Sequence, residues 1–494
     1  MKRTAFLTAT MVMTGSASVA RGEAAGAVPT KPNIVFILAD DLGWGDLSCY
    51  GHTRLKTPRL DRLAHEGVLF TQFYVNGSVC SPSRCAFMTG QYPARHRIHG
   101  HYADPKQNEA RGMSNWLDPN VPNVASLLKS AGYATAHFGK WHLGGGPGAP
   151  EPTAYGFDEA RTMVSVNPGW NEPADTFWAK STAAFVDEAI RFIRAHRERP
   201  FYVNIWTLIP HAPLNPTEEQ MKPYERFSWG HGVHHKSAET IYYASVGDLD
   251  QQVGRLLDEL DTLKLTSNTL VIFSSDNGPE DIHIGNAGHS GVGSAGPFRG
   301  RKRSLYEGGI RMPFIVRWPG HVPAGRVDDN SVVAGVDLLP TVCGLVGWKV
   351  PAGHTLDGED VGDILRGHSR ARKTDLMWEW RFHVFGEPFH RSPILAIREG
   401  DWKLLMNPDR SRIELYDIPR DPTQLNNAAD KHPEIVERLA EKVLAWQKTL
   451  PAGPMDPTAG KEDYPWPGKV QQPSGRTSRK TPPATRPGKQ VTDR

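Results

Sequence analysis

The stretch NIVFILADD, at residues 33–41, decides the fold of this chain. Apart from its leading Asn33, the run up to the two aspartates is apolar without alternation. Such a run is typical of a β-strand that is buried on both faces in the middle of a parallel sheet. Similar runs occur at residues 201–206 (FYVNIW) and 269–274 (TLVIFS). The sequence therefore predicts a sheet whose central strands come from these runs.

Helical patterns lie between these runs. One opens at Thr57, a candidate N-cap, with Pro58 in the first turn. A second covers residues 123–131 (NVASLLKSA) and is ended by Gly132. A third, at residues 238–263, carries apolar side chains at helical spacing. Because strands alternate with helices, we expect the α/β fold class, with helices on both faces of a sheet.

The pattern changes after about residue 370. Short strand patterns separated by turns occupy residues 394–397, 402–406 and 413–416. An amphipathic helix follows at residues 433–450. Strands that follow one another without helices between them pair as antiparallel neighbours. We therefore expect a catalytic domain over residues 31–370 and a smaller C-terminal α+β domain, with an antiparallel sheet, over residues 371–450.

The N-terminus has the composition of an export signal. Lys2 and Arg3 precede an apolar run at residues 5–13 and small side chains at residues 18–20. We therefore expect residues 1–24 to be a signal peptide and the mature protein to be secreted or periplasmic. An uncleaved anchor is the alternative, but this apolar run is too short to span a bilayer, and no later stretch predicts a membrane span.

Charge and composition argue against a nucleic-acid partner. The chain has 57 Lys and Arg residues against 54 Asp and Glu residues, and these charges are interleaved along its body. Nucleic-acid binders instead gather basic side chains on one face. Residues 451–494 are rich in Pro, Gly, Ser, Thr and basic residues, with almost no aliphatic side chains. This composition predicts a disordered tail.

Acidic side chains follow two of the predicted strands. Asp40 and Asp41 come directly after the first strand, and Asp276 and Asn277 come just after the run at residues 269–274. Ligands of open α/β sheets bind beyond the carboxyl ends of the strands. Three carboxylates and an amide oxygen at that edge suit Ca²⁺, with Mg²⁺ as the alternative. Simple turns are the other interpretation, because Asp and Asn favour turns.

The cysteines do not form a disulfide framework, because a chain of 494 residues has only four of them. We expect Cys49 and Cys343 to be small apolar residues, with a pairing left open, and Cys85 to pack in a helix. Cys80 lies close to Arg84. By itself this neighbourhood indicates a mildly activated thiol, and a loop cysteine at a helix end is the alternative.

The run Cys80-Ser81-Pro82-Ser83-Arg84, followed by Met88-Thr89-Gly90, resembles the signature of the formylglycine-dependent (type I) sulfatases. Further blocks that resemble this family recur in order between about residues 31 and 450. They lie at residues 40–46, 139–144, 210–213, 275–278, 299–311, 398–403 and 414–417. The resemblance is strongest for secreted carbohydrate sulfatases similar to N-acetylgalactosamine-6-sulfatase. It implies an alkaline-phosphatase-like mixed sheet sandwiched by helices, with a smaller C-terminal α+β domain.

The resemblance also implies a chemistry for Cys80. In this family the cysteine is oxidised by a formylglycine-generating or maturase enzyme to Cα-formylglycine (3-oxoalanine). Its hydrate presents two hydroxyls on one carbon. One hydroxyl, activated by Ca²⁺, attacks sulfur, and loss of the proton from the other expels sulfate. A serine or a thiol at position 80 would have no second hydroxyl from which to release sulfate in this way.

Roles for single residues follow from the resemblance. The expected metal shell is Asp40, Asp41, modified Cys80, Asp276 and Asn277. Arg84 would orient the diol, and Lys140 and Lys302 would pair with sulfate oxygens. His142 would act as the base for sulfate release. His211 would donate a proton to the leaving alcohol, a role suited to an ordinary histidine pKa of about 6.5.

The substrate is less determined by the sequence. Loops after residue 95, at residues 164–178 and at residues 377–391 are rich in Trp, His and Arg. Expected substrate-binding residues are Arg299, His289, Trp380, Arg381, His383, His390 and Arg391, with inter-domain packing as the alternative. Arg301 and Arg303 flank Lys302, where many relatives have small residues, and this added charge suits an anionic polymer.

We expect hydrolysis of sulfate esters on galactose or N-acetylgalactosamine units of a sulfated polysaccharide. A phosphoester or phosphonate ester hydrolase of the same superfamily is one alternative. A non-catalytic glycan-binding relative, with Cys80 left unmodified, is another.

Overall fold

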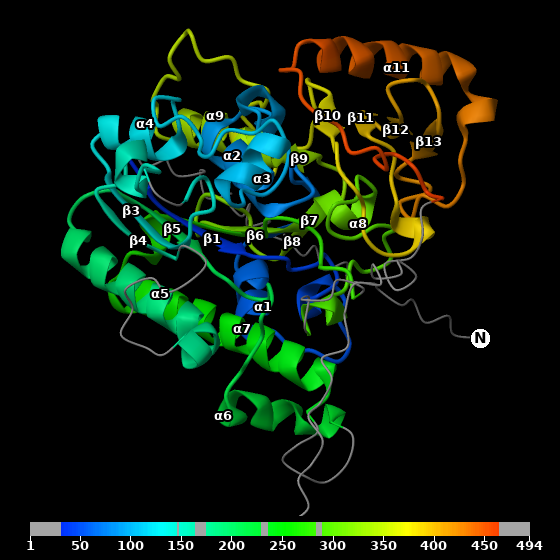
Figure 1. Cartoon of the computed structure of the whole chain (residues 1–494). Coiled ribbons are helices and arrows are strands. Elements are labelled where there is room, and N and C mark those ends of the chain that lie inside the picture. Colours follow the sequence, from blue (N-terminus) through cyan, green and yellow to red (C-terminus); the bar gives the residue numbers. More distant parts are fainter. Residues whose placement is uncertain (1–30, 146–147, 164–173, 229–235, 283–288, 464–494) are drawn as a thin grey trace, which may run out of the picture.

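The computed structural model describes residues 31–145, 148–163, 174–228, 236–282 and 289–463. The expected signal peptide therefore lies outside the described residues. Within them are a large mixed sheet and a smaller antiparallel sheet, which lie side by side (Figure 1). In spatial order the strands of the large sheet are β4 (Glu159–Met163), β3 (Ala134–Lys140), β5 (Phe201–Trp206), β1 (Asn33–Ala39), β6 (Thr269–Ser275), β7 (Arg311–Arg317), β2 (Val68–Tyr74) and β8 (Arg326–Asp328), and β9 (Val333–Ala334) also pairs with β2.

Strand β1 lies at the centre of the large sheet, as its apolar sequence predicts. It pairs in parallel with β5 and with β6, and Ala39 lies opposite Ser275 at the carboxyl ends. Alternate side chains of β1 enter two different cores. Ile34 and Phe36 pack on one face of the sheet, and Val35 and Ile37 pack on the other. This explains why β1 is apolar without alternation.

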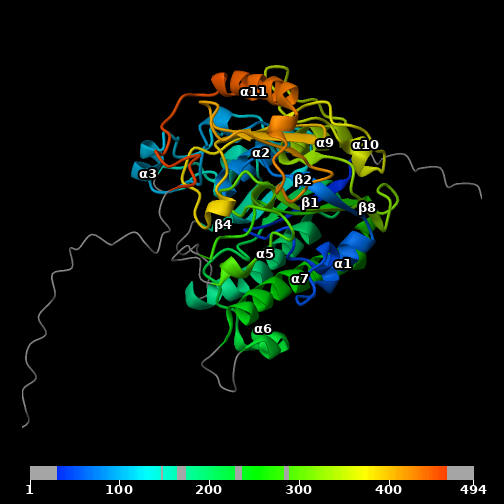
Figure 2. The same cartoon turned by 90° about the vertical axis from the view of Figure 1, so that its right-hand side faces the viewer.

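Helices cover both faces of the large sheet (Figures 1 and 2). One face packs against α1 (Pro58–His65), α5 (Ala174–His196) and α7 (Ala238–Thr262). The other face packs against α2 (Cys80–Thr89), α4 (Val124–Ser130) and α9 (Leu338–Leu345). The remaining short helices are α3 (Pro105–Ala110), α6 (Glu218–Met221), α8 (Glu307–Ile310) and α10 (Gly362–Leu365). Within the described ranges, no helix is both long and apolar enough to cross a membrane.

The start of α1 differs in one detail from the sequence prediction. Thr57 precedes the helix, but its side chain accepts no hydrogen bond from the first turn. The first-turn amides of Arg59 and Leu60 instead donate to Asp250 Oδ1, at 3.0 and 2.8 Å. Asp250 belongs to α7, so α1 is capped by a neighbouring helix, a partner that local sequence does not reveal.

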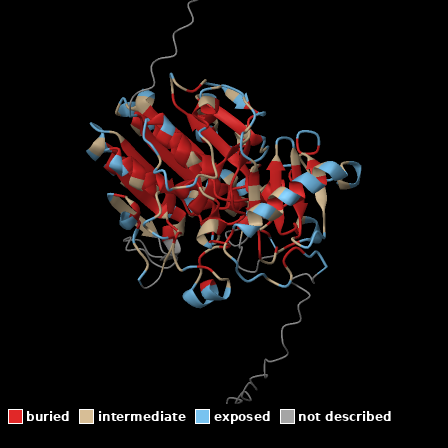
Figure 3. Cartoon of the chain, turned by 90° about the horizontal axis from the view of Figure 1, so that it is seen from above, coloured by how far each residue is buried: buried red, intermediate tan, exposed pale blue. Residues whose placement is uncertain are grey.

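The smaller sheet has the predicted antiparallel form. Its order is β10 (Leu376–Glu379), β11 (Leu395–Glu399), β12 (Trp402–Met406) and β13 (Glu414–Asp417). The helix α11 (Pro433–Lys448) packs on this sheet through Leu439 and Val443, and its outer face stays exposed (Figure 3).

The predicted disorder of residues 451–494 is wrong for their first part. Residues 451–463, which we call the C-terminal strap, follow α11 as turns (orange-red in Figure 1), and residues 464–494 lie outside the described chain. Arg381 Nη2 donates to the Pro451 carbonyl at 3.2 Å, and Asn407 Nδ2 donates to the Gly460 carbonyl at 3.1 Å. These partners are distant in sequence, so composition alone does not predict the ordered strap.

Candidate active site

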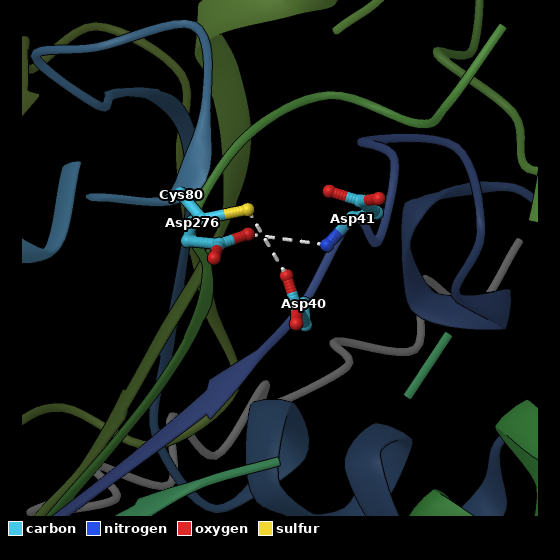
Figure 4. Close-up of side chains that lie close together, drawn as sticks. All are labelled: Asp40, Asp41, Cys80 and Asp276. Carbon is cyan, nitrogen blue, oxygen red and sulfur yellow. Dashed lines mark hydrogen bonds between the residues drawn. The ribbon is translucent and has the colours of Figure 1, made fainter. Parts of the chain in front are cut away.

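The strand-end acidic groups converge on Cys80 (Figure 4). Asp40 and Asp41 follow β1, Asp276 follows β6, and Cys80 is the first residue of α2. One side-chain ligand atom from each of these residues lies within 4.8 Å of every other, and all four residues are buried. Parallel pairing of β1 with β6 brings the two strand ends together. The expected metal-binding side chains are therefore neighbours in space.

Asn277 completes this cluster with an amide oxygen. Its Nδ2 donates to Asp41 Oδ1 at 2.7 Å and to the Gly278 carbonyl at 2.9 Å. Its Oδ1 is buried and accepts no hydrogen bond from any residue that the structure describes. A buried acceptor of this kind is costly unless it has a partner. Together with three carboxylates, it fits a hard divalent cation such as Ca²⁺ or Mg²⁺.

Three cationic side chains face the three carboxylates. Arg84 Nη2 lies 2.7 Å from Asp276 Oδ2, Lys140 Nζ lies 2.5 Å from Asp40 Oδ2, and Lys302 Nζ lies 2.7 Å from Asp41 Oδ2. The formal charges of these six groups cancel. This balance allows so many ionised groups to be buried together.

The carboxylates have different pKa values because their neighbours differ. Burial raises the pKa of Asp41, but Lys302, His211 and Lys140 outweigh it and hold that pKa well below its ordinary value. Burial and the nearby Asp40 raise the pKa of Asp276 to about 6, although Arg84 opposes them.

Cys80 is not an activated thiol in its unmodified form. Its side chain is buried, with Sγ 3.4 Å from Asp40 Oδ1 and 3.5 Å from Lys140 Nζ. Burial raises the pKa of Cys80 above its ordinary value, even though Lys140 and Lys302 lower it. The prediction of a mildly activated thiol, made from the proximity of Arg84, is therefore wrong, because Arg84 donates to Asp276 instead.

His142 has a free basic nitrogen. It has a positive φ of 53°, which is strained for a residue with a Cβ. Its Nε2 lies 3.1 Å from the Tyr102 carbonyl, which can only accept, so the ring proton lies on Nε2. Nδ1 is buried and has no hydrogen-bond partner among the described residues. Burial and Lys140 hold the pKa of His142 well below its ordinary value, so the ring is neutral.

His211 does not have the ordinary pKa that we expect from the sequence. Its Nδ1 lies 2.6 Å from the Ala212 carbonyl, and its Nε2 lies 3.8 Å from Asp41 Oδ2. Burial and Lys140 lower the pKa of His211 to about 4, although Asp41 opposes them. Without bound substrate, His211 is therefore neutral at pH 7.

A cavity of about 720 Å³, here called the catalytic cavity, opens over this cluster. The expected catalytic and metal residues on its wall are Asp41, Cys80, Lys140, His142, His211 and Lys302. The wall also includes His101 and Glu280, which the sequence did not mark as site residues, and Trp178 and Arg303, which it marked only for a substrate loop and for added positive charge. Trp178 belongs to the helix α5 rather than to a loop. The one available signal for Glu280 was its position three residues after Asn277.

Glu280 and Arg303 form an ion pair at the wall of this cavity. Arg303 Nη1 lies 2.5 Å from Glu280 Oε1, and Lys302 Nζ lies 3.4 Å from Glu280 Oε2. Burial raises the pKa of Glu280, but Lys302 and Arg303 outweigh it and lower that pKa to about 2. Arg301 donates instead to the backbone carbonyls of Glu280 and of neighbouring glycines.

The structure does not bring the expected substrate residues to the catalytic cavity. Arg299 stacks on Tyr306, with Cζ 3.8 Å from the ring centroid, and donates to the Phe389 carbonyl. Arg381 pairs with Glu379, two residues earlier, at 2.6 Å, and donates to the Pro451 carbonyl of the C-terminal strap. These side chains join different parts of the protein, which agrees with the alternative of inter-domain packing.

The remaining expected substrate residues divide into three groups. Arg391 is fully buried and donates to the Gly386 carbonyl, and His390 Nδ1 accepts from the Gly300 amide. His289 precedes Ser290, which lines the catalytic cavity. Trp380 and His383 border a second, smaller cavity beside the first.

Comparison with known proteins identifies the family. A family model described as Sulfatase matches residues 32–348. The chain belongs to the sulfatase family. It is therefore a sulfuric ester hydrolase with an alkaline-phosphatase-like fold. A second model, described as the C-terminal part of N-sulphoglucosamine sulphohydrolase, matches residues 296–449 of this sulfatase.

Curated relatives cover most of this sulfatase. An N-acetylgalactosamine-6-O-sulfatase of Bacteroides thetaiotaomicron is 30% identical, over 83% of this chain and 92% of its own. The N-acetylgalactosamine-6-sulfatase of Homo sapiens is 34% identical, over 88% and 89% of the two chains.

Solved structures agree in fold. A Bacteroides thetaiotaomicron sulfatase described under glycosaminoglycan metabolism gives a TM-score of 0.69 at 26% identity, covering 85% of this chain and 100% of that one. A protein in complex with k-i-k-neocarrahexaose gives a TM-score of 0.70 at 27% identity, covering 84% of this chain and 92% of that one.

Proposed function

We propose that this sulfatase removes sulfate from galactose or N-acetylgalactosamine units of a sulfated polysaccharide. The relatives named N-acetylgalactosamine-6-sulfatase and the neighbour in complex with a neocarrahexaose support this substrate class. The observation that carries the proposed chemistry is the convergence of Asp40, Asp41, Asp276 and Asn277 on the buried Cys80. We further propose that Cys80 is converted to formylglycine by a maturase, and that the protein is secreted or periplasmic.

The proposed metal site consists of Asp40, Asp41, Asp276, Asn277 and residue 80. A divalent cation held there, Ca²⁺ in our proposal, lowers the pKa of a hydroxyl on residue 80 and withdraws charge from a sulfate oxygen. Arg84 keeps Asp276 in place through two hydrogen bonds from Nε and Nη2, at 3.1 and 2.7 Å. Its position is fixed in turn by donation to the Lys140 carbonyl at 2.8 Å.

Charge favours an anionic substrate in this site. The three buried carboxylates are already balanced by Arg84, Lys140 and Lys302. A bound divalent cation therefore leaves a net positive charge, which attracts a sulfate ester. Lys140 and Lys302 line the catalytic cavity together with Cys80, so their ammonium groups can pair with sulfate oxygens as negative charge develops there.

The two histidines have complementary proton-transfer roles in this proposal. His142 lines the cavity and has an unprotonated, buried Nδ1, which in this proposal accepts the proton whose loss releases sulfate. His211 donates a proton from Nε2 to the leaving alcohol. Because its pKa is about 4 in the substrate-free site, this role requires the negative charge of the bound sulfate to raise that pKa.

Mass spectrometry of the peptide that contains position 80 tests the modification. We expect a mass loss equal to the replacement of the CH₂SH group by an aldehyde. An active preparation in which that peptide is wholly unmodified would exclude the mechanism. An inactive preparation with an unmodified peptide that still binds sulfated oligosaccharides would instead favour the glycan-binding alternative.

The phosphoester and phosphonate alternative is tested by substrate preference. A phosphonate monoester hydrolase of Agrobacterium radiobacter shares the fold, with a TM-score of 0.61 at 23% identity. We expect kcat/KM to be higher for an aryl sulfate than for the matched aryl phosphate or phosphonate. A clear preference for phosphate would refute the sulfatase proposal for this site.

A further inference from the structure

A second cavity, of about 430 Å³, lies beside the catalytic cavity. We call it the side cavity. Its border includes His101, Arg111, Arg303, Trp380, Phe382 and residues 454–457 of the C-terminal strap. His101 and Arg303 also border the catalytic cavity, so the two cavities are neighbours. The proposed catalytic roles use none of the residues that are specific to the side cavity.

Within the described chain, Arg111 borders the side cavity without an ion-pair partner, whereas the acidic Asp456 on the same border accepts hydrogen bonds from the amide and hydroxyl of Thr458. Arg111 Nη1 donates to the His101 carbonyl at 3.0 Å, and its Cζ lies 5.7 Å from the Phe382 ring centroid. Among the residues that the structure describes, no carboxylate lies within 4.0 Å of this guanidinium. Arg303 differs, because its charge is paired with Glu280. Arg111 is therefore the cation that remains available to a bound anion.

Aromatic rings form a further part of the border. Trp380, Phe382 and Phe385 all line the side cavity, and Arg303 lies over the Phe385 ring at 4.9 Å. Flat apolar rings pack against the apolar face of a sugar, while a planar guanidinium pairs with a carboxylate or sulfate through two parallel hydrogen bonds. The combination suits a sugar ring that carries an acidic group.

The C-terminal strap holds this cavity in a fixed shape. The Asp456 amide donates to the Arg381 carbonyl at 2.9 Å, and His383 Nδ1 lies 2.9 Å from Thr458 Oγ1. Gly112 has a positive φ of 66°, and a Cβ at this position would lie 2.5 Å from Pro454 Cδ. The strap is therefore in close contact with the end of α3. A cavity that is already formed loses little conformational entropy when a ligand binds.

We propose that the side cavity binds the sugar unit next to the sulfated one, and that this unit is anionic. The proposal rests on the proposed function, because a sulfated sugar in the catalytic cavity would extend its neighbour toward His101 and Arg303. Arg111 pairs with a carboxylate or a second sulfate on the neighbouring unit, and Trp380 and Phe382 cover its ring. The substrate is then a polyanionic saccharide rather than one with isolated sulfates.

Arg111→Gln tests this assignment, because glutamine keeps a donor for the His101 carbonyl but removes the charge. We would measure kcat/KM on sulfated disaccharides that differ only at the neighbouring unit: one with a carboxylate, one carboxyl-reduced and neutral, and one with a second sulfate. Arg111→Gln should lower the preference for an anionic over the neutral neighbour by roughly 10- to 100-fold. The anionic disaccharide whose kcat/KM falls more in Arg111→Gln identifies the acidic group that Arg111 binds.

Arg420→Gln is the matched control, since Arg420 is 87% exposed and pairs with Asp417 far from both cavities. It should leave the preference unchanged. An unchanged preference in Arg111→Gln, or an equal loss on neutral and anionic substrates, would overturn the assignment.

A binding measurement separates this assignment from the proposed function. Calorimetric titration of the wild-type protein with the desulfated acidic disaccharide requires no turnover. Binding that is lost in Arg111→Gln supports the side cavity, even if no sulfate ester is hydrolysed. Turnover of sulfated disaccharides without any effect of Arg111 would overturn the side-cavity assignment alone.

Discussion

Lys403 Nζ lies 2.8 Å from Glu307 Oε1, and both side chains are fully buried where the two sheets meet. Glu307 begins α8 beside the large sheet, whereas Lys403 belongs to β12 of the small sheet. Arg311 also pairs with Glu307, at 3.3 Å. Tyr74 donates to the same carboxylate and accepts from Arg398. The two sheets are therefore joined by buried charges as well as by apolar packing.

Loss of Glu307 and loss of Lys403 should destabilise the protein to different extents. Glu307→Gln leaves Lys403 and Arg311 without their ion-pair partner, so we expect it to cost about 3–5 kcal/mol of unfolding free energy. Lys403→Met leaves Glu307 with the two arginines and should cost clearly less. Urea unfolding of both variants measures the difference. Equal losses of unfolding free energy in the two variants would show that the arginines do not stabilise Glu307.

The same network predicts a loss of stability in acid. Burial raises the pKa of Glu307, but Lys403, Arg311 and Arg398 outweigh it and lower that pKa from 4.5 to about 2. Burial lowers the pKa of Lys403, and Arg398 and Arg311 lower it further, although Glu307 opposes them. A carboxylate whose pKa is lower in the folded state stabilises the fold above its unfolded pKa. We therefore expect this contribution to be lost as pH falls from about 4.5 to about 2.

Thermal unfolding at several pH values tests this prediction. The wild-type protein should lose stability across that acidic range, and Glu307→Gln should lose less because it has no carboxylate to protonate at this position. Parallel curves for the two proteins would contradict the assignment to Glu307.

Calcium should stabilise the folded protein through the strand-end cluster. A ligand present at about 100 times its Kd adds about 2.7 kcal/mol to the unfolding free energy. We expect calcium to raise the melting temperature, and a chelator to reverse the rise. Asn277→Leu removes the unpaired acceptor and should weaken this response. The exposed Asn120, changed to Leu, is the control and should respond as the wild type does.

His211 should matter most for poor leaving groups. His211→Ala is expected to lower kcat/KM on a sugar sulfate by about 10²- to 10⁴-fold, because the alcohol leaves only with a proton. The loss on nitrophenyl sulfate should be much smaller, since nitrophenolate leaves without one. His142→Ala should lower kcat/KM for both substrates to a similar extent. Equal losses on both substrates in His211→Ala would exclude its role as the acid.

The strands that decide the fold are evident from sequence because burial on both faces demands continuous apolar runs. Strand β7 is not evident, although it lies between β6 and β2. It contains Pro313, and a proline cannot donate to a neighbouring strand. The structure accommodates Pro313 opposite an irregularity in β2, where the pairing shifts between Phe70 and Phe73. Ser274 Oγ also donates to the Pro313 carbonyl, at 2.9 Å.

The strand-end cluster was easier to predict than the surroundings of the expected substrate residues. Asp40 and Asp276 end neighbouring parallel strands, so the pairing of the strands brings them together. Arg299 and Arg391 have the residue type expected of a substrate site, but their partners are carbonyl groups and rings of distant segments. Arg111 lies directly after the short helix α3 and borders the side cavity together with the distant C-terminal strap, a relationship that no local pattern contains.

The position of the C-terminal strap has a consequence for the order of synthesis. A chain that ends at residue 450 would already contain the strand-end cluster, both histidines and both sheets. It would lack the wall of the side cavity at residues 454–457. Ribosomal synthesis therefore completes the catalytic centre long before it completes this neighbouring cavity. Changes near the end of the gene could then alter which saccharides are chosen while leaving the chemistry of sulfate release intact.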